Sequence, residues 1–457
     1  MLKKNFVGGS LVVASLLIAG PAVAQHSGHG GHQPAQPAPA QPAPAQPDPH
    51  AGHGQQDEHQ GHEGHSEAAA AQDEHAGHDG GASDTSAEGS GTARVPLLDQ
   101  GAHGVHLDTA GWDLMLHGYA WGVYSDQGGP RGDEMPFVAT MLMAHAQRDL
   151  GGASVQLRTM LSLDPLMGDR GYPILFAAGE TAGGEPLVDR QHPHDFFMEL
   201  AAKVEVPVGG ATAFLYGGPV AEPALGPSAF MHRGSARYNP EAPIGHHWFD
   251  STHITFGVVT AGLRTGQFQI EGSAFRGREP DEERWDIETP KLDSWSVRGT
   301  WTPSPRWTAQ LSFGRLESPE RLHADEDEER LIASLSYADG ALAVTGAFAS
   351  KNRLPGPTVN AWLVEANWQL QGGHTLFGRL EQVDQDELLD HHDPRHENIY
   401  SVGRATLGYA HRLALGGPWR LALGGSASLH RVPEALEPDY GKTPLAFTLF
   451  AKVSLGD

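Results

Sequence analysis

The feature that most constrains the fold is a regular alternation of short and long connections between strand-like segments, from about residue 112 to residue 455. The short connections are tight turns, whereas the long ones are polar loops. Seven short and eight long connections separate sixteen strands and leave both ends of the series on the side of the short turns. Transmembrane barrels of the outer membrane have this arrangement. We therefore expect an all-β fold, a closed antiparallel outer-membrane barrel of about sixteen strands over residues 111–457.

Side chains within these segments alternate between apolar and polar. Phe268 and Ile270 share one face of a segment, and Gln269 and Glu271 share the other. Such a period of two turns one face of each strand toward lipid and the other toward the lumen. A soluble β-sandwich is the competing fold, but carboxylates such as Glu271 would be costly in its core. Outer-membrane lipid is therefore an expected partner.

The N-terminus predicts export. Lys3 and Lys4 precede an apolar stretch over residues 6–19, and Ala22-Val23-Ala24 ends in the small-x-small pattern of a cleavage site. We interpret residues 1–24 as a signal peptide, with an uncleaved anchor as the alternative. The expected location is the outer membrane, with both termini in the periplasm. The chain has no cysteine, so its metal ligands would be histidine, methionine and carboxylates.

Residues 25–110 are rich in histidine, proline and glycine, and we expect a disordered periplasmic tail because such a segment cannot bury enough apolar surface to fold. Neutral imidazole binds copper, zinc, nickel and cobalt, so the tail is a candidate metal collector. The alternative is a soluble spacer. Ten histidines lie between residues 25 and 92 of the tail, namely His26, His29, His32, His50, His53, His59, His62, His65, His75 and His78.

The first three strands predict an unusual lumen wall. Their polar faces carry methionine and histidine, the soft and borderline ligands that suit Cu(I) and do not suit magnesium or calcium. The alternative is that the methionines are flexible packing under an inward-folded loop. The residues concerned are Met115, His117, Met141, Met143, His145 and Met160.

Two long loops, 164–194 and 222–252, add further candidates. The second contains four prolines and follows Pro219, so we expect a stiff segment that folds inward and narrows the lumen. Side chains in and next to both loops could form a metal site at that constriction, or could simply hydrogen-bond a folded plug. The candidates are His192, His194, Met231, His232, His246, His247 and His253. Two acidic loops, 323–329 and 384–397, are expected to be solvated or to attract cations weakly.

Several functions are disfavoured by charge and motifs. The formal net charge of -25 argues against nucleic acid as a partner. No nucleophile elbow, phosphate loop or His-Glu-x-x-His motif is present, so we do not expect an enzyme. Assembly as a homotrimer is an open expectation.

The histidine tail and the Met/His-lined barrel resemble outer-membrane proteins of the copper resistance protein B type. The stretch from Phe230-Met231-His232 through Ile244-Gly245-His246-His247-Trp248 to Thr252-His253-Ile254-Thr255-Phe256-Gly257 also resembles uncharacterised exported barrels associated with metal resistance. The tail departs from the copper-resistance pattern because it contains no methionine, which leaves zinc, nickel and cobalt open beside copper.

The leading hypothesis, which rests on the tail imidazoles and the lumen methionines, is a metal-handling outer-membrane protein that sequesters or exports a transition metal, with copper favoured. It also implies periplasmic metal-handling proteins as partners. The rival hypothesis is a general porin or structural barrel with a plug loop and no specific metal role. Adhesion through the long loops is a third hypothesis.

Overall fold

The computed structural model describes residues 85–99, 104–396 and 398–456. The predicted signal peptide and the ten tail histidines lie outside the described residues. Among the described residues, no helix is both long enough and apolar enough to cross a membrane.

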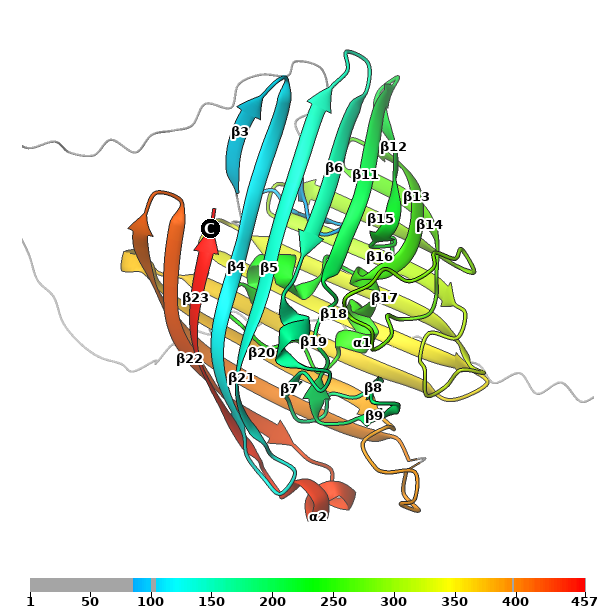
Figure 1. Cartoon of the computed structure of the whole chain (residues 1–457), viewed down its shortest axis with the longest axis vertical. Coiled ribbons are helices and arrows are strands. Elements are labelled where there is room, and N and C mark those ends of the chain that lie inside the picture. Colours follow the sequence, from blue (N-terminus) through cyan, green and yellow to red (C-terminus); the bar gives the residue numbers. More distant parts are fainter. Residues whose placement is uncertain (1–84, 100–103, 397, 457) are drawn as a thin grey trace, which may run out of the picture. The chain divides into compact units, whose positions relative to one another are not determined.

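The described chain forms a closed antiparallel barrel in which sixteen strands follow one another in sequence order and the last strand pairs with the first (Figure 1). This confirms the predicted fold class and strand number. In chain order the strands are β4 (Trp112–Gln127), β5 (Glu134–Asp149), β6 (Ser154–Leu161), β11 (Phe197–Val208), β12 (Ala211–Ala221), β13 (Thr255–Thr265), β14 (Phe268–Phe275), β15 (Ser294–Ser304), β16 (Trp307–Leu316), β17 (Asp327–Ala338), β18 (Leu342–Leu354), β19 (Thr358–Gln369), β20 (His374–Gln385), β21 (Tyr400–Gly416), β22 (Trp419–Arg431) and β23 (Leu445–Leu455).

The closure is completed by β3 (Val105–Thr109), a short strand that shares the edge of β4 with β23. Leu455 of β23 pairs with Gly118, and Val105 of β3 pairs with Leu116, so β3 continues along β4 where β23 ends. The sixteen-strand series therefore begins and ends at the same end of the barrel as the short turns. We call this the short-turn end, and the opposite end the long-loop end.

The connections follow the predicted alternation with one correction. Residues 352–358 were counted among the eight long connections of the sequence pattern, but the link between β18 and β19 consists only of residues 355–357. The polar residues before it belong to β18, where Lys351 and Arg353 are buried and Lys351 pairs with Glu320 at 2.6 Å. A polar run can therefore be a lumen-facing strand when its charges find partners inside.

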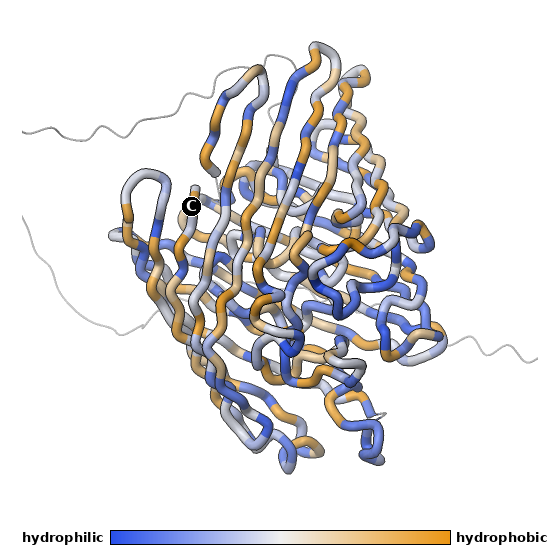
Figure 2. Tube along the Cα trace, in the orientation of Figure 1, coloured by the Kyte–Doolittle hydropathy of each residue, from blue (hydrophilic) through white to orange (hydrophobic). Residues whose placement is uncertain are grey.

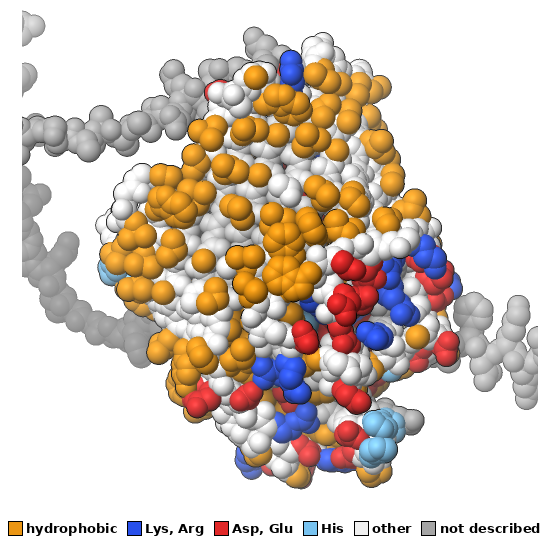
Figure 3. All heavy atoms as spheres, in the orientation of Figure 1, with side chains coloured by type: hydrophobic (Ala, Val, Ile, Leu, Met, Phe, Trp, Pro, Cys, Tyr) orange, Lys and Arg blue, Asp and Glu red, His pale blue; other side chains and the backbone are white. Residues whose placement is uncertain are grey.

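The outer surface of the barrel is apolar. Ile270 is 67% exposed on the outside, whereas its neighbour Glu271 is 3% exposed inside the lumen. Hydropathy alternates in this way along the strands (Figure 2), and hydrophobic side chains cover the wall over β4, β5, β6 and β11 while charges gather at the long-loop end (Figure 3). Exposed tryptophans on this surface are Trp295, Trp301, Trp307, Trp362, Trp368 and Trp419.

The lumen is filled from the inside by residues 222–254, which we call the plug loop. Almost every side chain of this loop is buried, as predicted for an inward-folded loop. Its turns are fixed by four short helices that carry the sequence-predicted histidines. They are η2 (Phe230–His232), η3 (Gly234–Ala236), α1 (His246–Phe249) and η4 (Ser251–His253).

The N-terminal part of the described chain corrects the predicted disordered tail. Residues 85–99 form a hairpin of β1 (Ser86–Glu88) and β2 (Arg94–Pro96), much of which is buried. We call it the lumen hairpin. The expected tail of 25–110 therefore includes ordered strands beyond residue 85, because polar residues that sequence alone would leave in solvent find partners inside the barrel. Thr92, for example, accepts hydrogen bonds from Gln269 and Arg298.

The remaining short elements lie in the connections. The loop over 162–196 holds η1 (Asp164–Met167), β7 (Tyr172–Pro173), β8 (Glu180–Ala182), β9 (Glu185–Leu187) and β10 (Arg190–Gln191). Elsewhere are η5 (Gln371–Gly373), η6 (Glu434–Leu436) and α2 (Glu437–Tyr440).

Candidate functional site

The plug loop is attached to the barrel wall by buried arginines that are themselves held by a neighbouring carboxylate. Arg298 on β15 pairs with Glu271 on β14 at 2.9 Å, and both side chains are buried. A second N–H group of Arg298 donates to the carbonyl oxygen of Gly226 in the plug loop at 3.0 Å. The guanidinium offers several donors in a rigid plane, so one group can satisfy both the wall carboxylate and the plug backbone.

The plug loop also contributes charges of its own. Arg233 in this loop donates to Glu365 on β19 at 2.6 Å and to Asp250 at 2.9 Å. Glu365 also accepts from Arg379 on β20 at 2.9 Å, and Arg379 donates to the carbonyl oxygen of Glu241 at 2.9 Å. Breaking such buried pairs is costly, because the remaining charge has no water to solvate it. The plug loop is therefore an integral part of the folded lumen.

The lumen hairpin joins the plug loop and the wall. Arg158 on β6 pairs with Glu199 on β11 at 3.1 Å and donates to the carbonyl oxygen of Gly91 at 2.8 Å. Ser90 donates its backbone N–H to the Ser228 hydroxyl of the plug loop at 3.0 Å. The hairpin is therefore hydrogen-bonded both to the barrel wall and to the plug loop.

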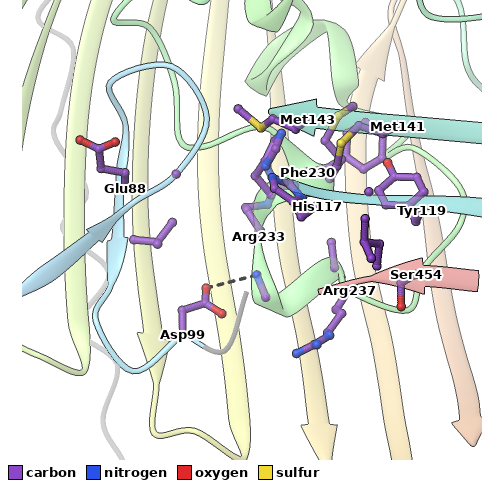
Figure 4. A pocket seen from close by; sticks show the side chains of 18 of the residues that line it. Glu88, Asp99, His117, Tyr119, Met141, Met143, Phe230, Arg233, Arg237 and Ser454 are labelled. Atoms are coloured by element: carbon purple, nitrogen blue, oxygen red, sulfur yellow. Dashed lines mark hydrogen bonds between the residues drawn. The ribbon is translucent and has the colours of Figure 1, made fainter. Parts of the chain in front are cut away.

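A cavity of about 490 Å³ remains beside the plug loop and the hairpin (Figure 4). Its lining includes Glu88 and Asp99 from the N-terminal segment, Ser454 from β23, and the plug-loop residues Phe230 and Arg237. These residues surround a space with both charged and apolar walls. The predicted methionine and histidine side chains of β4 and β5 form one of its sides.

Pairing between strands brings the predicted wall residues together. Met115 faces His145 and His117 faces Met143 across β4 and β5, while Met143 faces Met160 across β5 and β6. Met143 is 2% exposed, and the rings of His117 and His145 lie 6.4 Å apart between centroids. The predicted sharing of one lumen face by these residues is therefore confirmed, as a matter of geometry.

Two plug-loop residues join this wall rather than the other loop histidines. The Nε2 atom of His232 lies 3.4 Å from the sulfur of Met160, and its ring lies 6.0 Å from that of His117. Met231 packs against the same group, whose buried members include Met141. The seven loop residues that sequence placed in one candidate site are thus divided between two places.

Met198 belongs to the methionine group but was not predicted from the sequence. It is fully buried on β11 and packs with Met141 and Met160. The pairing of β11 with β6 changes register between Phe197 and Glu199, so the period-two pattern is interrupted at this residue. A rule based on alternation alone does not place it in the lumen.

The five remaining loop histidines form a second group toward the long-loop end. Ring centroids are 5.3 Å apart for His194 and His253, 5.2 Å for His253 and His246, 5.6 Å for His246 and His247, and 5.8 Å for His247 and His192. The predicted loop histidines therefore do gather in space, although they come from two different loops.

Oxygen atoms fix how several of these rings are turned. The Nδ1 atoms of His194 and His246 lie 2.9 Å and 2.8 Å from the carboxylates of Asp164 and Asp250. Nδ1 of His253 lies 2.6 Å from the backbone oxygen of Asp250. A ring that donates from Nδ1 keeps the lone pair of Nε2 for another partner, which is the usual arrangement of metal-binding histidine.

The pKa values of the buried groups in this region are shifted in different directions. Burial, together with the neighbouring Arg284 charge, lowers the pKa of His192 well below its usual value. For His247 burial acts in the same direction, but the carboxylates of Glu279 and Glu180 outweigh it and raise the pKa to about 9. Burial raises the pKa of Glu180 above its usual range. Such strong perturbation is common at functional sites and in structural ion-pair networks alike.

The two acidic loops meet at the long-loop end. His323 in the first lies 3.1 Å from Glu387 in the second, and Glu320 belongs to the same group. In contrast, Asp390, His391 and His392 form an exposed group. The second loop is therefore solvated only in part, since Glu387 is held in a contact between loops.

No protein-family model and no curated protein matches the sequence. The fold is similar to that of OmpF from Salmonella typhi, solved in complex with daunomycin, with a TM-score of 0.51, 9% identity, and coverage of 77% of this chain and 100% of that chain. An anion-selective porin from Comamonas acidovorans matches with a TM-score of 0.48, 12% identity and coverage of 75% and 100%. The channel DcaP of Acinetobacter baumannii matches with a TM-score of 0.47 and 12% identity, over 76% of this chain and 99% of that chain. At 9% identity, the match to OmpF shows a similar barrel fold.

Proposed function

We propose that the protein is an outer-membrane barrel of the channel type whose lumen is held closed by the plug loop and the lumen hairpin. The apolar outer wall supports a place in the membrane, and the shared porin fold supports a channel architecture. Barrels of sixteen strands are wide enough to leave an aqueous pore. The observation that carries the proposal is that the plug loop is almost completely buried and bonded to the wall on several sides.

Conductance across a planar lipid bilayer tests this proposal. The purified full-length protein is expected to conduct far less than an open barrel of sixteen strands. A variant in which residues 227–252 are replaced by a short glycine-serine turn is expected to conduct steadily. Arg233→Gln provides a second variant that keeps the chain length. A large conductance of the unchanged protein, or no increase in either folded variant, would contradict the proposal.

Metal handling is a second candidate function, and the methionine–histidine wall favours it. Thioether and imidazole groups together suit Cu(I), and the contact between Met160 and His232 at 3.4 Å places one of each side by side. In this hypothesis the tail collects copper, or zinc, nickel or cobalt, and the barrel sequesters or exports it. The competing explanation is that the methionines only pack under the plug loop. The expected homotrimer and periplasmic partner proteins stay predictions.

X-ray absorption of the full-length protein loaded with Cu(I) under anaerobic conditions separates these two explanations. The tail contains neither methionine nor cysteine, so any copper–sulfur contact must come from the barrel. We expect a sulfur shell that is lost in Met143→Leu/Met160→Leu. It should remain in the control Met135→Leu/Met167→Leu, whose side chains pack in a different cluster. A spectrum without sulfur in the unchanged protein would reject copper binding at the wall.

A further inference from the structure

We propose that Glu180, His192, His247 and Glu279 form a binding site for a borderline divalent cation of the zinc type. The four residues come from three loops at the long-loop end. Glu180 and His192 lie in the loop over 162–196, His247 lies in α1 of the plug loop, and Glu279 lies in the loop over 276–293. A cation bound here would tie the plug loop to two other loops. The inference is independent of conductance through the barrel.

The spacing of the side chains supports one shared ion. The ligand atoms of Glu180, His192 and His247 all lie within 4.8 Å of one another. Nε2 of His192 is 3.3 Å from Oε1 of Glu180, and Nδ1 of His247 is 3.2 Å from Oε2 of Glu279. Nitrogen and oxygen atoms bound to one tetrahedral zinc at about 2.0–2.1 Å lie roughly 3.3–3.4 Å apart. The Glu180–His192 pair and the His247–Glu279 pair each have about the separation of two ligands of one zinc, and Glu279 joins the group of three through His247.

Contacts with arginine orient the two carboxylates, so that one oxygen of each lies beside a histidine nitrogen. Arg284 holds Oε2 of Glu180 at 3.1 Å, so Oε1 of that carboxylate faces His192. Arg330 lies 3.5 Å from Oε1 of Glu279, so Oε2 faces His247. Each carboxylate therefore has one oxygen held by an arginine and the other beside an imidazole nitrogen. Metal sites rely on such outer contacts to orient their ligands.

The two histidines have nitrogen atoms available to a metal. Nδ1 of His192 lies 3.1 Å from the carbonyl oxygen of Pro193, which accepts its proton and leaves the lone pair of Nε2 toward Glu180. Nδ1 of His247 is buried and meets Glu279 outside hydrogen-bond geometry, so this atom has no hydrogen-bond partner among the described residues. A buried polar atom without a partner is costly, and a cation between the carboxylates would remove that cost.

The chemistry of the four groups selects the class of ion. Two imidazoles and two carboxylates suit zinc and the neighbouring divalent metals nickel and cobalt. Calcium and magnesium prefer a shell made of oxygen. No thioether belongs to this group of four, so it differs from the methionine–histidine wall and is not a Cu(I) site.

Zinc-dependent thermal unfolding of the full-length protein tests the site without interference from the tail. An ion bound by both folded and unfolded chains does not change the unfolding equilibrium, whereas an ion bound only by the folded site does. At zinc a hundredfold above the dissociation constant, the unfolding constant should fall about a hundredfold. The comparison is between His192→Gln/His247→Gln and the control His391→Gln/His392→Gln, which alters two adjacent exposed histidines.

The proposal expects zinc to raise the melting temperature of the unchanged protein and of the control, but not that of the site variant. Equilibrium dialysis should show one tightly bound zinc fewer in the site variant. If that variant does not fold, Glu279→Gln is measured in the same way, because it removes one ligand charge and keeps the shape of the side chain. An equal zinc effect in all folded variants, with unchanged zinc content, would overturn the proposal.

Discussion

The attachment of the plug loop by Arg233 allows a quantitative prediction. Arg233→Gln removes a buried cation that serves Glu365 at 2.6 Å and Asp250 at 2.9 Å. Removing one member of a buried ion pair costs about 3–5 kcal/mol. Both carboxylates keep another partner, since Arg379 contacts Glu365 and His246 contacts Asp250. We therefore expect the lower figure, about 3 kcal/mol, against the closed plug.

That free energy corresponds to a change of roughly a hundredfold in the ratio of closed to open plug, because about 1.4 kcal/mol is a factor of ten. The assay is single-channel recording, in which the open probability of Arg233→Gln should rise by up to this factor. The control is Arg315→Gln, whose pair with Asp327 at 3.0 Å is 49% exposed on the arginine side. Exposed pairs contribute about 0–1 kcal/mol. Equal open probabilities for the two folded variants would refute the reasoning.

Three further predictions address a buried carboxyl group in the lumen, the lumen hairpin and the outer wall of the barrel. Burial raises the pKa of Glu222 to about 8, so the stability contributed by its neutral form is complete below pH 4.5 and is lost as the pH rises toward 8. Glu222→Gln should therefore melt at the wild-type temperature at pH 4 and above it at pH 9; a pH-independent difference would contradict this. Ser90→Val removes the Ser90 hydroxyl, which accepts a hydrogen bond from the backbone N–H of Ala229 and shares another with the Ser228 hydroxyl. This variant should speed proteolytic cleavage of the plug loop, and an unchanged cleavage rate would contradict a role of the hairpin in holding that loop. Ile270→Arg places a charge on the exposed outer wall and should destabilise the lipid-embedded barrel by about 2–4 kcal/mol if the residue lies near the bilayer midplane. The unfolding free energy in vesicles measures this, and a value unchanged from wild type would indicate that this face does not meet lipid.

The fold could be predicted from the sequence because its determinants are local. Connection lengths fix the number of strands, and alternation fixes which residues face the lumen, so Met143 and Met160 could be placed on one wall. Arg353 was misassigned to a loop because its ion-pair partner Asp386 is remote in sequence. The lumen hairpin was not predicted for the same reason, because its polar groups are hydrogen-bonded by residues of the barrel wall that are remote in sequence.

The candidate sites were predictable only in part. Histidine-rich segments marked His192 and His247, but nothing in their spacing pointed to Glu180 or Glu279, which belong to separate parts of the chain. The lumen position of Met198 could not be predicted, because the register of β11 changes at this residue and interrupts the alternation. Ligand sets assembled from several loops depend on long-range packing, and a single sequence does not encode that packing in a periodic pattern.

The most direct test of the account is a disulfide between the plug loop and the wall. The hydroxyl of Ser235 in the plug loop lies 2.8 Å from that of Thr345 on β18, and the chain has no cysteine to compete. In the protein assembled in outer membranes, Ser235→Cys/Thr345→Cys is expected to form the disulfide almost completely and to suppress the added conductance of Arg233→Gln until a reductant is supplied. A folded barrel in which the two cysteines remain unlinked would contradict a plug loop inside the lumen.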